Sequence, residues 1–346
     1  MLRHLSATAC VFLLCTALLA GNSYVWLVNH VPNGDAVHYL LMAEGHFERV
    51  NSFHRYRVLV PMLANALAQI IVWTRTIGGG TSTTLALGFS FYVLNTLLLA
   101  SASTFIYRTA RIGGASFTSA CCGALAVISS GMAMYITGSA LIDSLAICTV
   151  AVLFYALTAR HKWLLFCSIV IMLLAKEQLV VLLPVAFYYG RFASWMQRIT
   201  AISLSFLLLF VCRYQLDILY PITPQSPSSG IVQVMVSHIQ DHVLSTCIYL
   251  FTWKGLGDIL VAFGGFTLLI PIGFTGGKAS RRAWLSHMPA VSGPFLLCVV
   301  IFVLLSGDVA RMTFYAAPCF GVAIALILQY HPAFIALRRR LLASIA

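Results

Sequence analysis

The sequence predicts an all-α protein of many membrane-spanning helices, in one domain that covers residues 1–346. Sixty per cent of its residues are hydrophobic and only 9% are charged, whereas a typical soluble domain has about 25% charged residues. Apolar runs of about 20 residues recur along the chain, and each is long enough to cross the hydrocarbon core of a bilayer. We therefore predict an integral membrane protein with about ten spans and no separate soluble domain.

The predicted spans follow one another with mostly short connections. The first begins behind a basic start and resembles a signal peptide, but its apolar stretch continues to Val28 and is too long for a cleaved signal. We therefore predict that it stays in place as a first transmembrane helix with a cytoplasmic start. The expected spans are residues 5–28, 58–74, 84–107, 115–136, 139–159, 163–190, 199–220, 256–274, 290–306 and 309–330.

Basic residues gather in some connections, while two other connections are unusually long. The net charge is +12, and arginine and lysine concentrate in 190–198, 276–282 and 338–340, as is typical of cytoplasmic loops. The long connections 29–57 and 221–255 then fall on the outer face, which is the periplasmic side of a bacterial inner membrane. The basic excess indicates contact with anionic lipid headgroups, and no nucleic-acid partner is expected.

Counting the spans in order leaves one group of basic residues on the wrong side. The residues on the outer face, against the positive-inside bias, are Arg108, Arg111, Arg160 and Lys162. The long segment 163–190 offers an alternative, because it is either one kinked span or two half-helices that turn at Lys176 and Glu177. Two half-helices would reverse the orientation of everything before them, so that another crossing upstream would be needed.

The first long connection carries a concentration of charge next to lipid. Asp35 begins the pattern DAVHYLLMAEGHFERV, whose apolar residues at 37, 40, 41 and 47 predict a short amphipathic helix on the membrane surface. At the start of this helix, Asp35 is either a helix cap or a reactive acid. Arg55 and Arg57 follow at the outer end of the second span, where guanidinium groups either hold a phosphate or extend to headgroups.

Other ionisable residues lie within or beside later spans, where a charge near the bilayer centre costs at least roughly 2.5 kcal/mol. Asp143 follows a stretch of small residues, and Asp308 and Arg311 are three residues apart, so they can pair on one helix face. Lys176 and Glu177 are adjacent, and neighbours on a helix point about 100° apart. Each therefore needs its own partner. Such residues either hold helices together as ion pairs or form a functional site.

Neither cysteine nor histidine predicts a metal site. The ten cysteines lie almost entirely in apolar runs and lack zinc-type spacing. His30, His38, His46 and His54 are spaced eight apart, but eight residues correspond to two helical turns plus about 80°. On one helix these side chains would fan around the axis, so the spacing predicts no ligand set.

Five segments occur in an order similar to that of a known class of enzymes. They are GDAVHYLLMAEG, FHRYRVLVPMLA, Asp143 behind its small residues, AKEQLVVLLP and GDVARMTFYAAP. In this order the chain resembles bacterial integral-membrane glycosyltransferases of the GT-C class, over about its first 190 and its last 40 residues. The resemblance implies that a sugar is transferred, with inversion, from a polyprenyl-phosphate donor to a glycan or lipid-linked acceptor on the outer face.

The resemblance also implies roles for single residues. Asp35 is the candidate general base, and the candidates for binding the lipid phosphate are Arg55, Arg57, Lys176 and Arg311. The supporting residues it implies are His38, Tyr39, Asp143, Glu177 and Asp308. The class often has paired acids in the first loop, whereas here Ala36 and Val37 follow Asp35, so a divalent cation is possible as a cofactor but is not supported.

Two alternative functions stay open from the sequence. One is a flippase or transporter of a lipid-linked sugar, which would bind the same phosphate without bond chemistry. The absence of a visible inverted repeat in the sequence argues against it, because many transporter folds contain such repeats. The other is a non-catalytic membrane subunit of a polysaccharide-assembly complex, a role that the unpaired acid in the first loop fits.

Overall fold

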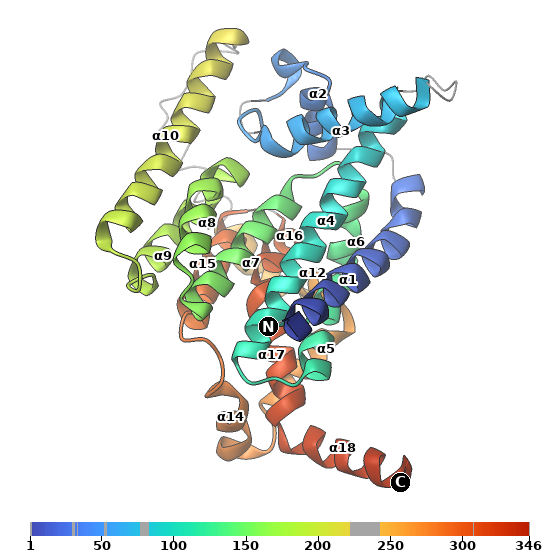
Figure 1. The fold of residues 1–346 in the computed structure, drawn as a ribbon, viewed down its shortest axis with the longest axis vertical. Helices are drawn as coiled ribbons and strands as arrows, with labels where there is room; N and C mark the ends of the chain where they lie inside the picture. The colour runs from blue at the N-terminus through green and yellow to red at the C-terminus, as the bar shows by residue number, and fades with distance from the viewer. Residues whose placement is uncertain are drawn as a thin grey trace.

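The protein folds as a bundle of helices (Figure 1). The structure, a computed structural model, describes residues 2–29, 32, 34–51, 54–76, 83–221, 243–306 and 308–345, and no strand occurs within them. The α-helices are α1 (Leu2–Asn29), α2 (Asp35–Ala43), α3 (Leu59–Thr76), α4 (Thr83–Ile112), α5 (Phe117–Ile128), α6 (Gly131–Gly138), α7 (Asp143–Ala159), α8 (Lys162–Ala175), α9 (Leu183–Tyr189), α10 (Trp195–Leu219), α12 (Trp253–Phe263), α13 (Leu269–Gly273), α14 (Gly277–Leu285), α15 (Ser292–Leu305), α16 (Val309–Thr313), α17 (Ala317–Tyr330) and α18 (Pro332–Ile345), and residues 243–250 are also helical. Short 3₁₀ helices are η1 (Phe47–Arg49), η2 (Glu177–Leu182), η3 (Gly264–Leu268) and η4 (Phe314–Ala316). The predicted second outer loop, 221–255, lies largely outside the described residues.

The bundle has two ends that differ in charge. We call the end with α2 and residues 44–51 and 54–58 the loop end, and the end with α14 and α18 the tail end; α2 and α18 lie far apart in Figure 1. The acidic residues that the structure describes all lie at the loop end, and they are Asp35, Glu44, Glu48, Asp143, Glu177, Asp217, Asp258 and Asp308. The tail end is therefore basic.

The chain passes repeatedly between the two ends. α1 runs to the loop end, where Trp26 donates a hydrogen bond to Ser139 behind α6. α4 runs to the tail end, where the backbone N–H of Ser116, just before α5, donates to Gln329 of α17. α5 and α6 return together, α7 runs back to the tail end, and α8 returns again. Later, α10 and α15 run toward the loop end, and α12 to α13 and α16 to α17 run away from it.

The predicted span 58–74 does not cross the bundle, which corrects the sequence prediction. It corresponds to α3, which begins at the loop end directly after Arg57. α4 begins at the loop end as well, because Gly88 lines the same small cavity as Ala36 and Leu40 of α2. The short connection 77–82 joins the two helices, so α3 stays at the loop end, and Figure 1 shows it beside α2.

The segment 163–190 forms two half-helices, the second of the two alternatives. α8 ends at Ala175, and the backbone of its C-cap residue Lys176 is extended (φ −166°, ψ 120°). η2 and α9 then run back toward the beginning of α8. Gly190, behind α9, lies against the beginning of α8, since a Cβ built on Gly190 would be 2.8 Å from Cδ2 of Leu165. The segment is thus a hairpin with Lys176 and Glu177 at its tip.

These two findings remove the conflict in the distribution of basic residues. α3 does not cross the bundle as predicted, and the hairpin crosses it twice where one crossing was predicted. Relative to the prediction, only the segments between α3 and the hairpin therefore end on the opposite side. Arg108 lies over the ring of Tyr155, 4.5 Å from its centroid, which brings the end of α4 beside the end of α7. The four residues that counting left on the outer face, Arg108, Arg111, Arg160 and Lys162, thus lie at the basic tail end.

Several helices are long and apolar enough to cross a membrane, which supports the membrane prediction. Within the described residues these are Ala7–Asn29, Ala86–Ile112, Trp195–Leu219, Trp253–Gly273 and Val309–Tyr330. α5 and α6 are a further candidate as a pair bent by 59°. The remaining passes, such as α7, α8 and α15, are shorter apolar helices. Fewer than the ten predicted spans therefore reach full length, and the count of ten remains a prediction.

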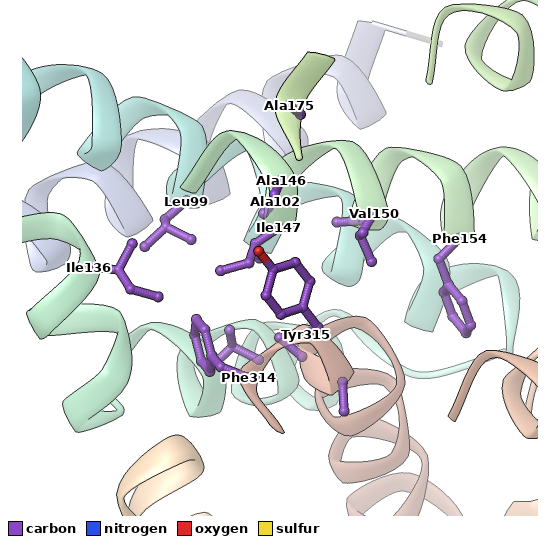
Figure 2. Packing of buried hydrophobic residues seen from close by; sticks show 14 of the residues in the cluster. Leu99, Ala102, Ile136, Ala146, Ile147, Val150, Phe154, Ala175, Phe314 and Tyr315 are labelled. Carbon is purple, nitrogen blue, oxygen red and sulfur yellow. The ribbon is translucent and has the colours of Figure 1, made fainter. Parts of the chain in front are cut away.

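The tightest packing lies among α4, α5, α7 and α17. A Cβ built on Gly123 of α5 would lie 2.2 Å from the carbonyl oxygen of Gly321 in α17, so only glycine allows these backbones to approach so closely. Figure 2 shows Phe314 and Tyr315 within the same buried cluster as Ile147 of α7. This cluster fixes the residues on either side of Arg311, which belongs to the candidate site.

Candidate functional site

Asp35 lies in the first turn of α2 but does not cap it. Gly34 occupies the N-cap position with φ 49°, and no side chain caps this helix end. The predicted short helix is confirmed, but the predicted apolar face is wrong, because the buried residues of α2 are Ala36, Tyr39, Met42 and Ala43. The interpretation of Asp35 as a helix cap is wrong, because its carboxylate contacts distant parts of the chain instead.

The carboxylate of Asp35 accepts two hydrogen bonds. Nη1 of Arg311 lies 2.6 Å from Oδ2, and Nε2 of His54 lies 2.9 Å from Oδ1. The hydrogen bond from His54, together with the charge of Arg311, holds the pKa of Asp35 well below its usual value, although partial burial acts in the opposite direction. Because its pKa is lowered, Asp35 is ionised at neutral pH. Its side chain is 27% exposed, so a ligand from outside can reach it.

Arg311 is the centre of a larger network. Besides Asp35, its guanidinium faces Asp308, with Nε 3.1 Å from Oδ2, and Asp143, with Nη1 3.7 Å from Oδ2. Asp308 also caps α16, because its side chain accepts a hydrogen bond from the backbone N–H of Arg311. The predicted pairing of Asp308 with Arg311 is therefore confirmed, and Arg311 joins three carboxylates at once.

The innermost part of the network is a buried ion pair. Nζ of Lys176 lies 2.8 Å from Oδ1 of Asp143, and the two side chains are 4% and 1% exposed. The hydroxyl of Tyr315 donates to the same oxygen of Asp143 over 2.9 Å. Asn95 of α4 donates to the carbonyl groups of Ile136, Ser139 and Leu141, at the end of α6 and in the connection to α7. Asp143 is thereby held inside the bundle at the point where α6 gives way to α7.

A second ion pair joins the first loop to the tip of the hairpin. Arg57 donates to both carboxylate oxygens of Glu177, over 3.1 Å from Nε and 3.0 Å from Nη2. Its Nη1 donates to the hydroxyl of the buried Tyr39 over 3.1 Å. Lys176 and Glu177 thus have separate partners, as the sequence predicts, and the hairpin tip contacts α7 and the first loop at the same time.

Arg55 does not belong to this network, which corrects its prediction as a phosphate ligand. Its side chain is 1% exposed. Nη2 donates to the backbone carbonyls of Leu216, over 2.8 Å, and of Tyr220. Leu216 lies in the last turn of α10, where its carbonyl also accepts the backbone N–H of Tyr220, and Tyr220 directly follows the helix. Arg55 therefore closes α10 against the first loop and has a structural role.

His54 belongs to the site, although the sequence analysis gave it no role. Its Nε2 bonds to Asp35 and its Nδ1 faces Oδ1 of Asn51. Its ring stacks on that of His38, with centroids 4.9 Å apart. The eight-residue spacing of the histidines on a single helix gave no signal, because His38 and His54 lie on different elements. The described residues contain no cluster of ligands that could hold a metal ion.

The network combines charges of both signs in a gradient of exposure. Asp308 is 41% exposed and Asp35 is 27% exposed, whereas Asp143 and Lys176 are buried. The cations Arg57, Lys176 and Arg311 all have carboxylate partners. An anionic ligand that binds Arg57, Lys176 or Arg311 therefore has to take over that cation from a carboxylate. The contacts of Arg311 with Asp35 and of Arg57 with Glu177 are partly exposed, whereas that of Lys176 with Asp143 is buried.

Comparisons of the chain with models of protein families, with curated proteins and with solved structures find no match.

Proposed function

We propose that the protein is a membrane glycosyltransferase. It transfers a sugar, with inversion, from a polyprenyl-phosphate donor to a hydroxyl group of a glycan or of a lipid-linked acceptor. The observation that carries this proposal is the position of Asp35, a partly exposed carboxylate held between Arg311 and His54 at the loop end. The order of sequence segments that resembles the GT-C class supports the same function.

The residue types fit the reaction. The acceptor oxygen attacks the anomeric carbon while its proton passes to the carboxylate of Asp35, which acts as the general base. The bond between that carbon and the phosphate oxygen breaks, and the electron pair leaves with the lipid phosphate. Arg311 stabilises the growing negative charge on that phosphate. This electrostatic stabilisation is strongest where water is scarce. His54 holds the Asp35 carboxylate in place and is a positioning residue.

The pairing of Arg311 with Asp35 couples donor binding to the strength of the base. A donor phosphate that takes over Arg311 removes one of the two groups that hold the pKa of Asp35 low. The pKa then rises toward its usual value, and a carboxylate of higher pKa is a stronger base. Asp35 is thus held as a weak base until a donor arrives. The ion pair of Arg57 with Glu177 holds the hairpin tip against the first loop, and that of Lys176 with Asp143 holds it against α7, while Arg311 changes partner.

The distribution of charge supports an orientation for the reaction. The basic tail end faces the cytoplasm under the positive-inside bias, and the loop end then faces the outer side, the periplasm in a bacterial inner membrane. A donor with a polyprenyl tail remains in the bilayer, so its phosphate reaches the loop end at the level of the headgroups.

A transfer assay tests this function. Wild-type protein is reconstituted in proteoliposomes with a panel of polyprenyl-phosphate sugars and acceptors, and released polyprenyl phosphate is measured. Asp35→Asn is expected to lower the rate by about 10²–10⁴-fold, the usual effect of losing a general base, while donor binding persists. The matched control is Glu48→Gln, which changes a 51% exposed acid of the same loop outside the network. Normal transfer by Asp35→Asn would exclude Asp35 as the base.

The two alternatives make different predictions in the same vesicles. A flippase moves the lipid-linked sugar between leaflets without releasing polyprenyl phosphate, whereas a non-catalytic subunit does neither. Transbilayer movement without any transfer by the wild type would therefore support the flippase, and binding of other assembly proteins without either activity would support the subunit.

A further inference from the structure

A groove at the tail end lies outside the proposed reaction site. It runs between the first turns of α8 and α10 and encloses about 280 Å³. Its floor is apolar and buried, and is formed by Leu165, Ile169 and Ala201. Phe166 and Trp163 form one wall, and Trp163 is 74% exposed. An apolar groove of this kind needs an apolar occupant.

The rim of the groove is basic. Lys162 and Arg198 line it directly, and no acidic residue that the structure describes lies at this end. Arg198 donates to the carbonyl of Phe187 and lies over the ring of that residue, while its Nε is buried without a hydrogen-bond partner. Two cations without a carboxylate partner beside an apolar groove attract a ligand that is anionic at one end and apolar along the rest.

The size of the groove and its place in the bundle limit the occupant further. Its volume of about 280 Å³ is near the lower limit of small-molecule sites, roughly 300 Å³, which favours a single narrow chain over a helix about 10 Å across. Trp163 and Trp195 are largely exposed beside it, and exposed tryptophans at helix ends are typical of the interface between membrane and water. The occupant therefore lies at headgroup depth, with a chain that extends into the bilayer.

We propose that this groove binds an anionic phospholipid of the leaflet at the tail end. Its phosphate lies between Lys162 and Arg198, and one acyl chain lies along Leu165, Ile169 and Ala201. The bound lipid fills the seam between α8 and α10, and so stabilises the hairpin whose tip carries Lys176 and Glu177. This site is independent of the proposed transfer reaction, because it lies at the opposite end of the bundle.

Lipid retention in nanodiscs tests the proposal. The discs contain equal amounts of phosphatidylglycerol and phosphatidylcholine with the same acyl chains, and native mass spectrometry counts the lipids that stay bound. Wild-type protein is expected to retain phosphatidylglycerol preferentially. Lys162→Ala with Arg198→Ala is expected to weaken this retention by about thirtyfold, from the usual contribution of two basic residues near a membrane surface.

The control removes two charges at the same end but away from the groove, by Lys278→Ala with Arg281→Ala in α14, and is expected to retain the lipid. Lys162→Glu alone serves as a second variant, because this exposed residue can change without disturbing the fold, and it is expected to lose the preference too. Equal retention of both lipids by the wild type, or equal losses in the groove variants and in the α14 control, would overturn the proposal.

Discussion

The buried pair of Lys176 and Asp143 allows a quantitative test of how the loop end is held together. Lys176→Met keeps the length of the side chain but removes the ammonium group 2.8 Å from Asp143. Asp143 then still has the hydroxyl of Tyr315 at 2.9 Å and the guanidinium of Arg311 at 3.7 Å. Breaking a buried pair usually costs about 3–5 kcal/mol. Because two partners remain, we expect a loss near the lower value, about 3 kcal/mol.

Removing the charge of Asp143 is expected to lower the free energy of unfolding more than removing that of Lys176. Asp143→Asn leaves Lys176 with the ring of Tyr315, 5.1 Å away, and with no second carboxylate within ion-pair distance among the described residues. We therefore expect a loss near the upper value, about 5 kcal/mol. The double variant removes both charges, so its loss should be smaller than the sum of the two single losses by up to about 3 kcal/mol.

The assay is equilibrium unfolding in mixed micelles, followed by tryptophan fluorescence, for the wild type, both single variants and the double variant. Glu48→Gln serves as the control, because an exposed surface acid is expected to contribute little. Additive losses in the double variant would show that the two residues are not coupled. A larger loss for Lys176→Met than for Asp143→Asn would refute the assignment of Tyr315 and Arg311 as remaining partners of Asp143.

Further outcomes are expected at the loop end. Arg55→Ala should lower the unfolding temperature but leave donor affinity unchanged in a binding titration, because the guanidinium of Arg55 donates to backbone carbonyls at the end of α10. The pKa of Asp35 is held low in the folded state, so the ionised group stabilises the fold at neutral pH, and this contribution is lost as the pH falls below about 4. Thermal unfolding of the wild type should therefore become more sensitive to acid than that of Asp35→Asn, and equal pH profiles would contradict this. With reactive native cysteines replaced, cysteines at Asn51 and Lys278 should be labelled from opposite sides of the membrane; labelling of both from one side would contradict the two-ended bundle.

Most of the charged network could be identified from the sequence, but of its connections only the pairing of Asp308 with Arg311 could be. Asp35, Asp143 and Arg311 stand out in the sequence because charges beside apolar spans are costly and so indicate pairing or function. Arg55 and Arg57 could not be distinguished from the sequence, since both lie at the end of the same loop, directly before the second predicted span. The structure separates them: Arg57 faces the carboxylate of Glu177, whereas Arg55 faces the end of α10. His54 was missed because its contact with Asp35 depends on the tertiary position of residues 54–58 against α2.

The sequence by itself determined that the chain is helical and rich in apolar segments, that a short helix begins at Asp35, and that the charges of the first loop are unusual. Each of these follows from composition and from periodicity over a few turns. Only the tertiary structure decided that α3 stays at the loop end, that 163–190 turns back at Lys176, and that Asp35 pairs with Arg311, 276 residues further along the chain. The physical reason is that hydropathy reports whether a segment prefers lipid, whereas the direction of a segment and the partner of a charge are set by packing between helices that are distant in sequence.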